Sequence, residues 1–187
     1  MTRPIALPDP PLADPSTGIV LRPWAPTPTD AEALAAAWAD PEIAAAARVP
    51  DDTSLAAAAR WIAGDPGRRA AGLSLDLVVA ALDGGDAVLG EVGLTTIDRE
   101  RRRAEMGWWI AAEYRGRGLA GAAARLLADW ALSPVGGLDQ VWARLTPGNA
   151  ASARVAAAAG LVELGAAGGT AVWARTRPGR SHGRRPA

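Results

Sequence analysis

A glycine-rich segment between a strand-like run and a helical run constrains this chain more than any other feature. Residues 106–110 are apolar and predict a strand, and residues 114–120 (Tyr-Arg-Gly-Arg-Gly-Leu-Ala) then lead into a helical pattern that continues to Ala131. Glycines let backbone N–H groups turn inward together, and the positive end of the helix dipole adds to them. Arg115 and Arg117 supply full positive charges. The segment therefore predicts an anion site, for which a diphosphate is the natural guest.

Length and composition predict one globular domain. The chain has 187 residues, of which 49% are hydrophobic, and its formal net charge is zero. We expect a single α/β domain over residues 18–177, a disordered Pro-rich segment over residues 1–17 and a disordered basic tail over residues 178–187. No run resembles a membrane span or the apolar core of a secretory signal, so the expected location is the cytoplasm and no membrane partner is expected.

The residues that are missing restrict the chemistry. The chain has no cysteine, and its single histidine, His182, lies in the basic tail. A thiolate nucleophile, a disulfide framework and a Ser-His-Asp relay are therefore not expected, and neither is a metal site. Proton transfer must use carboxylates, hydroxyls, backbone groups or water.

Periodicity and turn signals predict alternating strands and helices. Asp83–Asp86 is a good hairpin turn, and Gly64–Gly67 is expected to end the helix before it. The predicted strands cover residues 19–24, 73–82, 87–97, 104–111, 140–146 and 171–175. Helices are predicted over residues 31–39, from Pro41 onward, and over residues 54–63, 119–131 and 149–159.

Three ordered motifs together resemble a known family. They are Ile19-Val-Leu-Arg-Pro-Trp24, then Gly107-Trp-Trp-Ile110 with the glycine-rich loop, and finally Asn149-Ala-Ala-Ser152 with Gly160-Leu161. The set is similar to the GCN5-related N-acetyltransferase (GNAT) superfamily, in its RimJ/RimL-like branch of ribosomal-protein N-terminal acetyltransferases. This resemblance implies a mixed, mostly antiparallel sheet of about six or seven strands flanked by helices, with the strands before and after the cofactor helix splayed apart.

The resemblance also implies a binding site for acetyl-CoA. The strand over residues 107–110 would lie beside the pantetheine, and a bulge near Gly107 would direct an N–H, that of Trp109 or Ile110, at the thioester oxygen. Asn149 would cap its helix and present its amide to the pantetheine. The cofactor-binding residues implied in this way are Trp109, Ile110, Arg115, Gly116, Arg117, Gly118, Leu119, Ala120, Asn149 and Ser152.

Two carboxylates are candidates for the base that deprotonates an amine. Strand alternation places Glu105 on the same face as Gly107 and Trp109, which makes it the first candidate, and Glu91 on the preceding strand is its rival. For each of them a solvated or cross-strand-paired carboxylate is an equally good interpretation.

The resemblance places the Ser152 hydroxyl near the departing sulfur, where it would donate a proton or orient the thiol, with water as the alternative acid. Many members of the superfamily have a tyrosine where this chain has Ala156. The same resemblance places Trp24, Trp38 and Trp61 in the segment that builds the acceptor pocket.

The implied activity is transfer of an acetyl group from acetyl-CoA to a primary amine by direct attack in a ternary complex. The acceptor is left open between a protein N-terminal α-amine, a small-molecule amine and a lysine side chain, and the protein is expected to be a monomer or a homodimer. Two alternatives remain, a non-catalytic acyl-CoA-binding module and an acyltransferase that uses another donor such as succinyl-CoA. The zero net charge gives no support to nucleic acid as a partner, although the basic tail leaves docking on RNA open.

Overall fold

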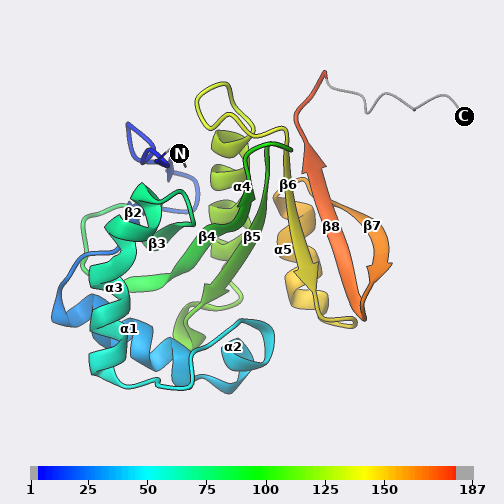
Figure 1. Ribbon diagram of the computed structural model, residues 1–187. Coiled ribbons are helices and arrows are strands. Elements are labelled where there is room, and N and C mark those ends of the chain that lie inside the picture. The colour runs from blue at the N-terminus through cyan, green and yellow to red at the C-terminus, as the bar shows by residue number, and fades with distance from the viewer. Residues whose placement is uncertain (1–3, 180–187) are drawn as a thin grey trace, which may run out of the picture.

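The computed structural model describes residues 4–179 and shows one eight-stranded sheet with helices on both faces (Figure 1). The spatial order of the strands is β1-β2-β3-β4-β5-β6-β8-β7. The strands are β1 (Ala13–Asp14), β2 (Ile19–Pro23), β3 (Leu75–Ala81), β4 (Val88–Asp98), β5 (Arg103–Ile110), β6 (Gln140–Leu145), β7 (Val162–Ala167) and β8 (Thr170–Thr176). The helices are α1 (Pro28–Ala39), α2 (Pro41–Ala46), α3 (Leu55–Ala70), α4 (Leu119–Ala131) and α5 (Ala150–Ala158), with a short 3₁₀ helix η1 (Ala112–Tyr114). Within residues 4–179 no helix combines the length and the apolar character needed to cross a membrane.

All neighbouring strands are antiparallel except β5 and β6, which are parallel and joined through α4. This confirms the expected mixed, mostly antiparallel sheet, with one or two strands more than expected. Strands β5 and β6 pair only from Arg103↔Gln140 to Glu105↔Trp142. Beyond this register the two strands diverge toward their carboxyl ends (Figure 1). The splay predicted around the cofactor helix is therefore present.

One face of the sheet carries the main hydrophobic core. Alternate residues of the strands, such as Leu77, Val92 and Met106, pack against the small buried side chains of α4 and α5. Gly121 of α4 lies so close to α5 that a Cβ there would stand 2.9 Å from the Cβ of Ala158. The alanine-rich sequence of these helices thus allows them to approach one another closely.

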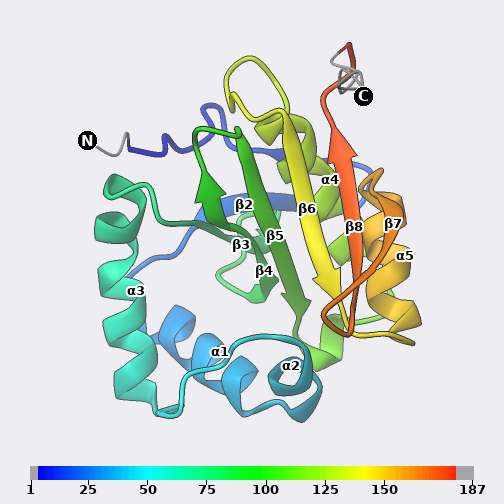
Figure 2. The same ribbon diagram turned by 45° about the vertical axis from the view of Figure 1, so that its right-hand side comes forward.

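The other face is covered only in part, by α1 and α3 (Figure 2). Trp24, Val78 and Ala80 form a second buried cluster with Leu34 of α1 and Ile62 of α3. Beyond this cluster Gly107 of β5 is exposed, and a side chain there would meet nothing within 4 Å. The second face is therefore open beside β5, next to the splay.

The N-terminal segment differs from the disordered stretch expected for residues 1–17. Ala13 and Asp14 form β1, which pairs with β2, and Asp14 accepts hydrogen bonds from Ser16 and from Arg125 of α4. The irregular sequence does not signal the pairing of β1 with β2 or the long-range contact of Asp14 with Arg125. The expectation for the basic tail concerns residues 178–187, of which 180–187 lie outside the described residues.

Two further elements differ from the sequence prediction. Helix α3 continues through Pro66 to Ala70, although Gly64–Gly67 was expected to end it. Buried Asp65 lies within ion-pair distance of Arg68 and Arg69 one turn later, and these contacts hold the last turns of the helix together beyond the proline. The edge strand β7 was not predicted, because all six of its residues are exposed and show no alternation.

A buried ion pair connects the first long strand to the first helix, and its removal has a predictable cost. Arg22 donates two hydrogen bonds to Asp30, at 2.7 and 2.8 Å, and Asp30 is 1% exposed. Asp30 also accepts the N–H of Ala25. We expect Asp30→Asn to lower the free energy of unfolding by about 3 kcal/mol, because it leaves a largely buried guanidinium without its counter-charge.

Chemical denaturation of the wild type and the variant tests this, with Arg60→Gln as the matched control. The Arg60–Asp52 pair is exposed on both sides, so the control should behave as the wild type. Equal stability of the Asp30→Asn variant and the control would show that the buried pair contributes nothing.

Candidate active site

The glycine-rich loop has the backbone geometry that its sequence predicts. Gly116 and Gly118 both have φ of 77°, in the left-handed region that side chains avoid. Helix α4 begins directly after Gly118, and no side chain caps its N-terminus. The first N–H groups of α4, those of Leu119 and Ala120, therefore have no partner within the helix and are available to an anion.

This loop opens into a cavity of about 770 Å³ between the splayed strands. Its walls come from the ends of β5 and β6, the loop, the first turn of α4, the first turns of α5, and α2. The cavity brings together all ten residues that the resemblance implies as a cofactor site, namely Trp109, Ile110, Arg115, Gly116, Arg117, Gly118, Leu119, Ala120, Asn149 and Ser152. Among its other walls, Ile43 and Ala45–Ala47 at the end of α2 were not predicted from the sequence.

The edge of β5 directs backbone groups into this gap. The N–H of Ala111 donates to Leu89 of β4, so strand alternation points the N–H of Ile110 away from β4 and toward the splay. The β4–β5 register is regular from Leu94↔Met106 to Gly90↔Ile110, so the bulge expected near Gly107 is absent. The shift in register lies instead between Thr95 and Asp98. Of the two amides named from the sequence, that of Ile110 faces the gap.

The two arginines of the loop have different surroundings. Arg115 donates to the carbonyl of Ile110 and forms ion pairs with Asp40 and Glu42 at the start of α2. Arg117 donates to the carbonyl of Glu113, and its charge lies over the ring of Tyr114. Arg115 therefore ties α2 to the loop, while the carboxylates partly neutralise its charge. Arg117 has no carboxylate among these contacts and is the better source of positive charge for an anion.

Helix α5 presents the two polar residues expected from the sequence. The Asn149 side chain accepts the N–H of Ser152 at 2.9 Å, so the predicted cap is present. Ser152 lines the cavity and is partly exposed. Ala156, at the position where many relatives have tyrosine, is fully buried. Ser152 thus carries the hydroxyl that α5 brings to the cavity wall.

Glu105 is held by an ion pair on the open face of the sheet. Its two carboxylate oxygens accept hydrogen bonds from Arg144 at 2.9 and 3.0 Å, and Thr96 donates to it at 3.0 Å. Glu105 does not line the cavity. The ion pair with Arg144 stabilises the charged carboxylate and so makes Glu105 a weaker proton acceptor.

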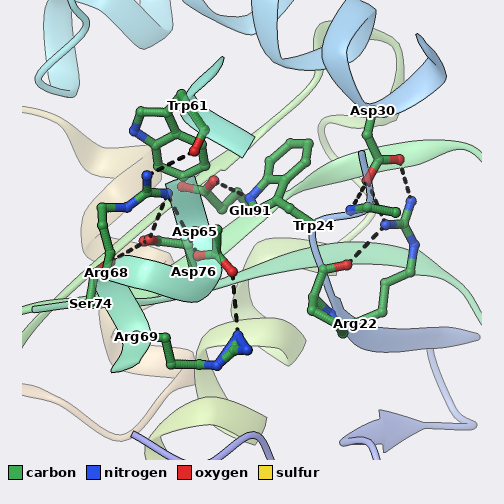
Figure 3. Close-up of polar contacts among 12 residues, drawn as sticks. Arg22, Trp24, Asp30, Trp61, Asp65, Arg68, Arg69, Ser74, Asp76 and Glu91 are labelled. Carbon is green, nitrogen blue, oxygen red and sulfur yellow. Dashed lines mark hydrogen bonds and ion pairs between the residues drawn. The ribbon is translucent and has the colours of Figure 1, made fainter. Parts of the chain in front are cut away.

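Glu91 has a different environment. It pairs with Trp109, a wall of the cavity, and accepts a hydrogen bond from the Trp24 indole at 2.8 Å (Figure 3). Burial, followed by the nearby charge of Asp76, raises the pKa of Glu91 from 4.5 to about 8, although hydrogen bonds from Trp24 and Trp109 oppose the shift. Glu91 remains partly accessible to solvent. It is thus a carboxyl that titrates near neutral pH. Glu91 does not line the cavity itself, but its strand partner Trp109 does.

Of the residues near Glu91, the sequence pointed to Trp24 and Trp109 but gave no site role to the charged residues Asp65, Arg68 and Asp76. Asp65, Arg68 and Asp76 lie on the same side of the sheet, and both aspartates are almost completely buried. One signal was available for Asp76, because a carboxylate within the apolar run Leu75–Ala81 is costly to bury without a reason.

Comparison with known proteins places this site in a family. Residues 19–162 match the model of the acetyltransferase (GNAT) domain, and since the match covers most of the chain, the protein belongs to this family. The RimJ/RimL-like resemblance also agrees with a relative from Bacillus subtilis (strain 168) named "Putative ribosomal N-acetyltransferase YdaF", which is 35% identical over 81 residues. That match spans 43% of this chain and 44% of the relative, so it covers less than half of either protein.

Solved structures share the fold. Mycobacterium smegmatis RimJ, in complex with CoA-disulfide, has a TM-score of 0.72 at 23% identity, over 89% of this chain and 85% of its own. The microcin C7 self-immunity acetyltransferase MccE, in complex with acetyl-CoA and AMP, has a TM-score of 0.70 at 17% identity, over 85% of this chain and 92% of its own. The expected GNAT fold is confirmed.

Replacing Gly118 should remove coenzyme A binding without unfolding the protein. A Cβ at Gly118 would meet no protein atom within 4 Å, so Gly118→Val introduces backbone strain of about 1–2 kcal/mol and a side chain at the mouth of the anion site. We expect the affinity for CoA, measured by calorimetry, to fall at least about tenfold.

Gly168→Val is the matched control, because Gly168 also has positive φ and open space but lies in the turn between β7 and β8. It should have a similar loss of stability and unchanged CoA affinity. Wild-type CoA affinity in the Gly118→Val variant would contradict the assignment of the loop.

The raised pKa of Glu91 predicts a pH dependence of stability. Since the folded protein favours the protonated carboxyl, the contribution to stability is complete below 4.5 and is lost as the pH rises through about 8. Unfolding measured at pH 5 and pH 8.5 should show a decrease that Glu91→Gln reduces by on the order of 2 kcal/mol. An equal decrease in the Glu91→Gln variant would show that Glu91 is ionised in the folded protein at both pH values.

Proposed function

We propose that this protein transfers an acetyl group from acetyl-CoA to an α-amine, by direct attack within a ternary complex. The observation that carries the proposal is the cavity in which the uncapped N-terminus of α4, the free edge of β5 and Ser152 of α5 converge. These groups suit the diphosphate, the pantetheine amides and the thioester of one extended ligand.

The donor side relies on backbone groups. The N–H groups at the start of α4 receive the diphosphate, with Arg117 as the nearby cation. Pantetheine lies along the free edge of β5 as an additional strand would. The N–H of Ile110 donates to the thioester oxygen and stabilises the charge that gathers on it in the transition state.

Glu91 is the proposed base, in preference to Glu105. Its pKa of about 8 lies near the operating pH, where a base is most effective, whereas both oxygens of Glu105 are held by Arg144 and Thr96. Because Glu91 does not line the cavity, it receives the proton through a water molecule beside Trp109.

The same pKa favours an α-amine as the acceptor. An α-ammonium group has a pKa of about 8 and a lysine ammonium one of about 10.4. Proton transfer to Glu91 is therefore nearly balanced for the α-amine and unfavourable by about 3 kcal/mol for lysine.

The proposed chemistry balances without further reactants. The neutral amine attacks the thioester carbon, an N–C bond forms, and the C–S bond breaks. The ammonium proton goes to Glu91 before the attack, the nitrogen loses its second proton to water, and the departing sulfur gains one from Ser152, which water replenishes. A covalent acyl-enzyme is not required, and the chain has no cysteine to form one.

A matched pair of peptides tests the proposal. The same sequence is prepared with a free N-terminus and a blocked lysine, and with a blocked N-terminus and a free lysine, and small amines complete the panel. We expect acetyl-CoA to add one acetyl group to the free α-amine, located by tandem mass spectrometry. Modification confined to lysine would contradict the α-amine assignment. Tight CoA binding without any transfer would favour a non-catalytic acyl-CoA-binding module, and transfer with succinyl-CoA alone another donor.

Two isosteric variants separate the candidate bases. Glu91→Gln should lower kcat about 100-fold or more with little change in CoA affinity, because it removes the proton acceptor alone. Glu105→Gln should leave kcat within a few-fold of the wild type. The reverse pattern would assign the base to Glu105.

A further inference from the structure

Three carboxyl groups, one of them that of Glu91, gather where α3 packs on the sheet (Figure 3). We call Asp65 of α3, Asp76 of β3 and Glu91 of β4 the carboxyl cluster. Asp65 is 2% exposed and Asp76 is 6% exposed. The reaction proposed above uses Glu91 alone and leaves the other two carboxyls without a role.

Strand register brings Asp76 and Glu91 together. Asp76 pairs with Gly93 and Val78 pairs with Glu91, so the two carboxyls occupy diagonal positions on one face of neighbouring strands. Gly93 makes room for this arrangement, because a Cβ there would stand 2.8 Å from Oδ1 of Asp76. The carboxyl of Asp76 therefore extends across β4, next to Glu91.

The positive charge beside this pair is limited. Nη2 of Arg68 lies 3.6 Å from Asp65 and 3.9 Å from Asp76, so one guanidinium is shared between two carboxyls. Arg68 also donates to the carbonyl of Trp61 and stacks on its ring at 3.9 Å. Within the carboxyl cluster, the ion pair of Arg69 is with Asp65.

The remaining groups around the pair are neutral donors or are already paired. Ser74 donates to Asp76 at 2.7 Å, and Trp24 donates to Glu91 at 2.8 Å. On the side of α1, Asp30 is paired with Arg22. Among the ion pairs of residues 4–179, none involves Glu91.

Two adjacent desolvated carboxyls with part of one cation cannot both ionise without a large electrostatic cost. Such a pair retains one proton and titrates as a unit. We propose that Asp76 and Glu91 share a single proton, and that Asp76 and Arg68 are positioning residues with opposite effects on its release from Glu91. In acetyl transfer, which rests on the function proposed above, the pair that has lost its shared proton takes one proton from the amine and later returns it to solvent.

The two positioning residues act through charge, so their removal has opposite signs. Asp76→Asn removes a negative neighbour, and Glu91 then ionises at lower pH. Arg68→Gln removes the cation, and Glu91 then ionises at higher pH. Arg68→Lys keeps the charge and is the matched control. A residue that only supports the fold would change stability without moving these titrations in opposite directions.

Tryptophan fluorescence measures the titration without any acceptor, because the Trp24 indole donates directly to Glu91. The wild type should show a transition near pH 8, and Glu91→Gln should abolish it. We expect Asp76→Asn to move the midpoint down by about one pH unit, Arg68→Gln to move it up by a similar amount, and Arg68→Lys to leave it in place. The Arg68→Gln variant provides an independent measurement if Asp76→Asn does not fold.

The pH dependence of kcat/KM with a fixed acceptor should follow the same order, with its acidic limb at lowest pH in Asp76→Asn and at highest pH in Arg68→Gln. If the titration midpoints of the Asp76→Asn and Arg68→Gln variants coincide, or move in the same direction from that of the wild type, the inference is overturned. Fluorescence shifts in the expected order with no acetyl transfer to any amine would count against the proposed function and would leave the shared proton supported.

Discussion

The separation of β5 from β6 is the constraint on which the site depends. The ladder between them ends at Glu105↔Trp142, although both strands continue for several residues. Backbone N–H and C=O groups along the unpaired edges need partners once water is excluded. A ligand with its own amides satisfies them by lying along β5 as an extra strand would. The same divergence gives the first turn of α4 access to the end of that ligand, so strand pairing and anion binding follow from one geometric feature.

The two faces of the sheet differ in how completely helices cover them. Helices α4 and α5 seal one face with small side chains, and this close packing fixes the N-terminus of α4 against the sheet. On the other face α1 and α3 cover only the strands near β3, and the exposed Gly107 leaves β5 open. The sheet is therefore accessible beside β5 from the face opposite α4 and α5. Arg115 holds α2 against the glycine-rich loop.

The sequence predicts what depends on neighbours along the chain. Gly116 and Gly118 adopt the left-handed conformation that only glycine adopts easily, and Asn149 caps its helix because an amide side chain reaches the next turn. Features without a local pattern are not predicted in this way. Helix α3 continues through Pro66, where the sequence indicates a break, and β7 has no alternation although it pairs with β8 across the turn that joins them. The environment of Glu91 likewise requires β3, β4 and α3 to meet, so the sequence ranked Glu105 first by strand alternation and left Glu91 as its rival.

A protein whose one histidine lies in its C-terminal tail still needs a group that exchanges protons near neutral pH. Burial among indoles supplies one, because the Trp24 and Trp109 rings exclude water from a carboxyl while offering it only neutral donors. The desolvation that raises the pKa of Glu91 also disfavours its charged form in the folded state. A higher pKa of Glu91 therefore lowers the free energy of unfolding at alkaline pH. Arg68 moderates this conflict without removing it, since a full ion pair with Glu91 would return its pKa to that of an ordinary surface carboxylate. In the proposed arrangement, Arg68 is shared between Asp65 and Asp76, and Glu91 without a full ion pair can exchange its proton.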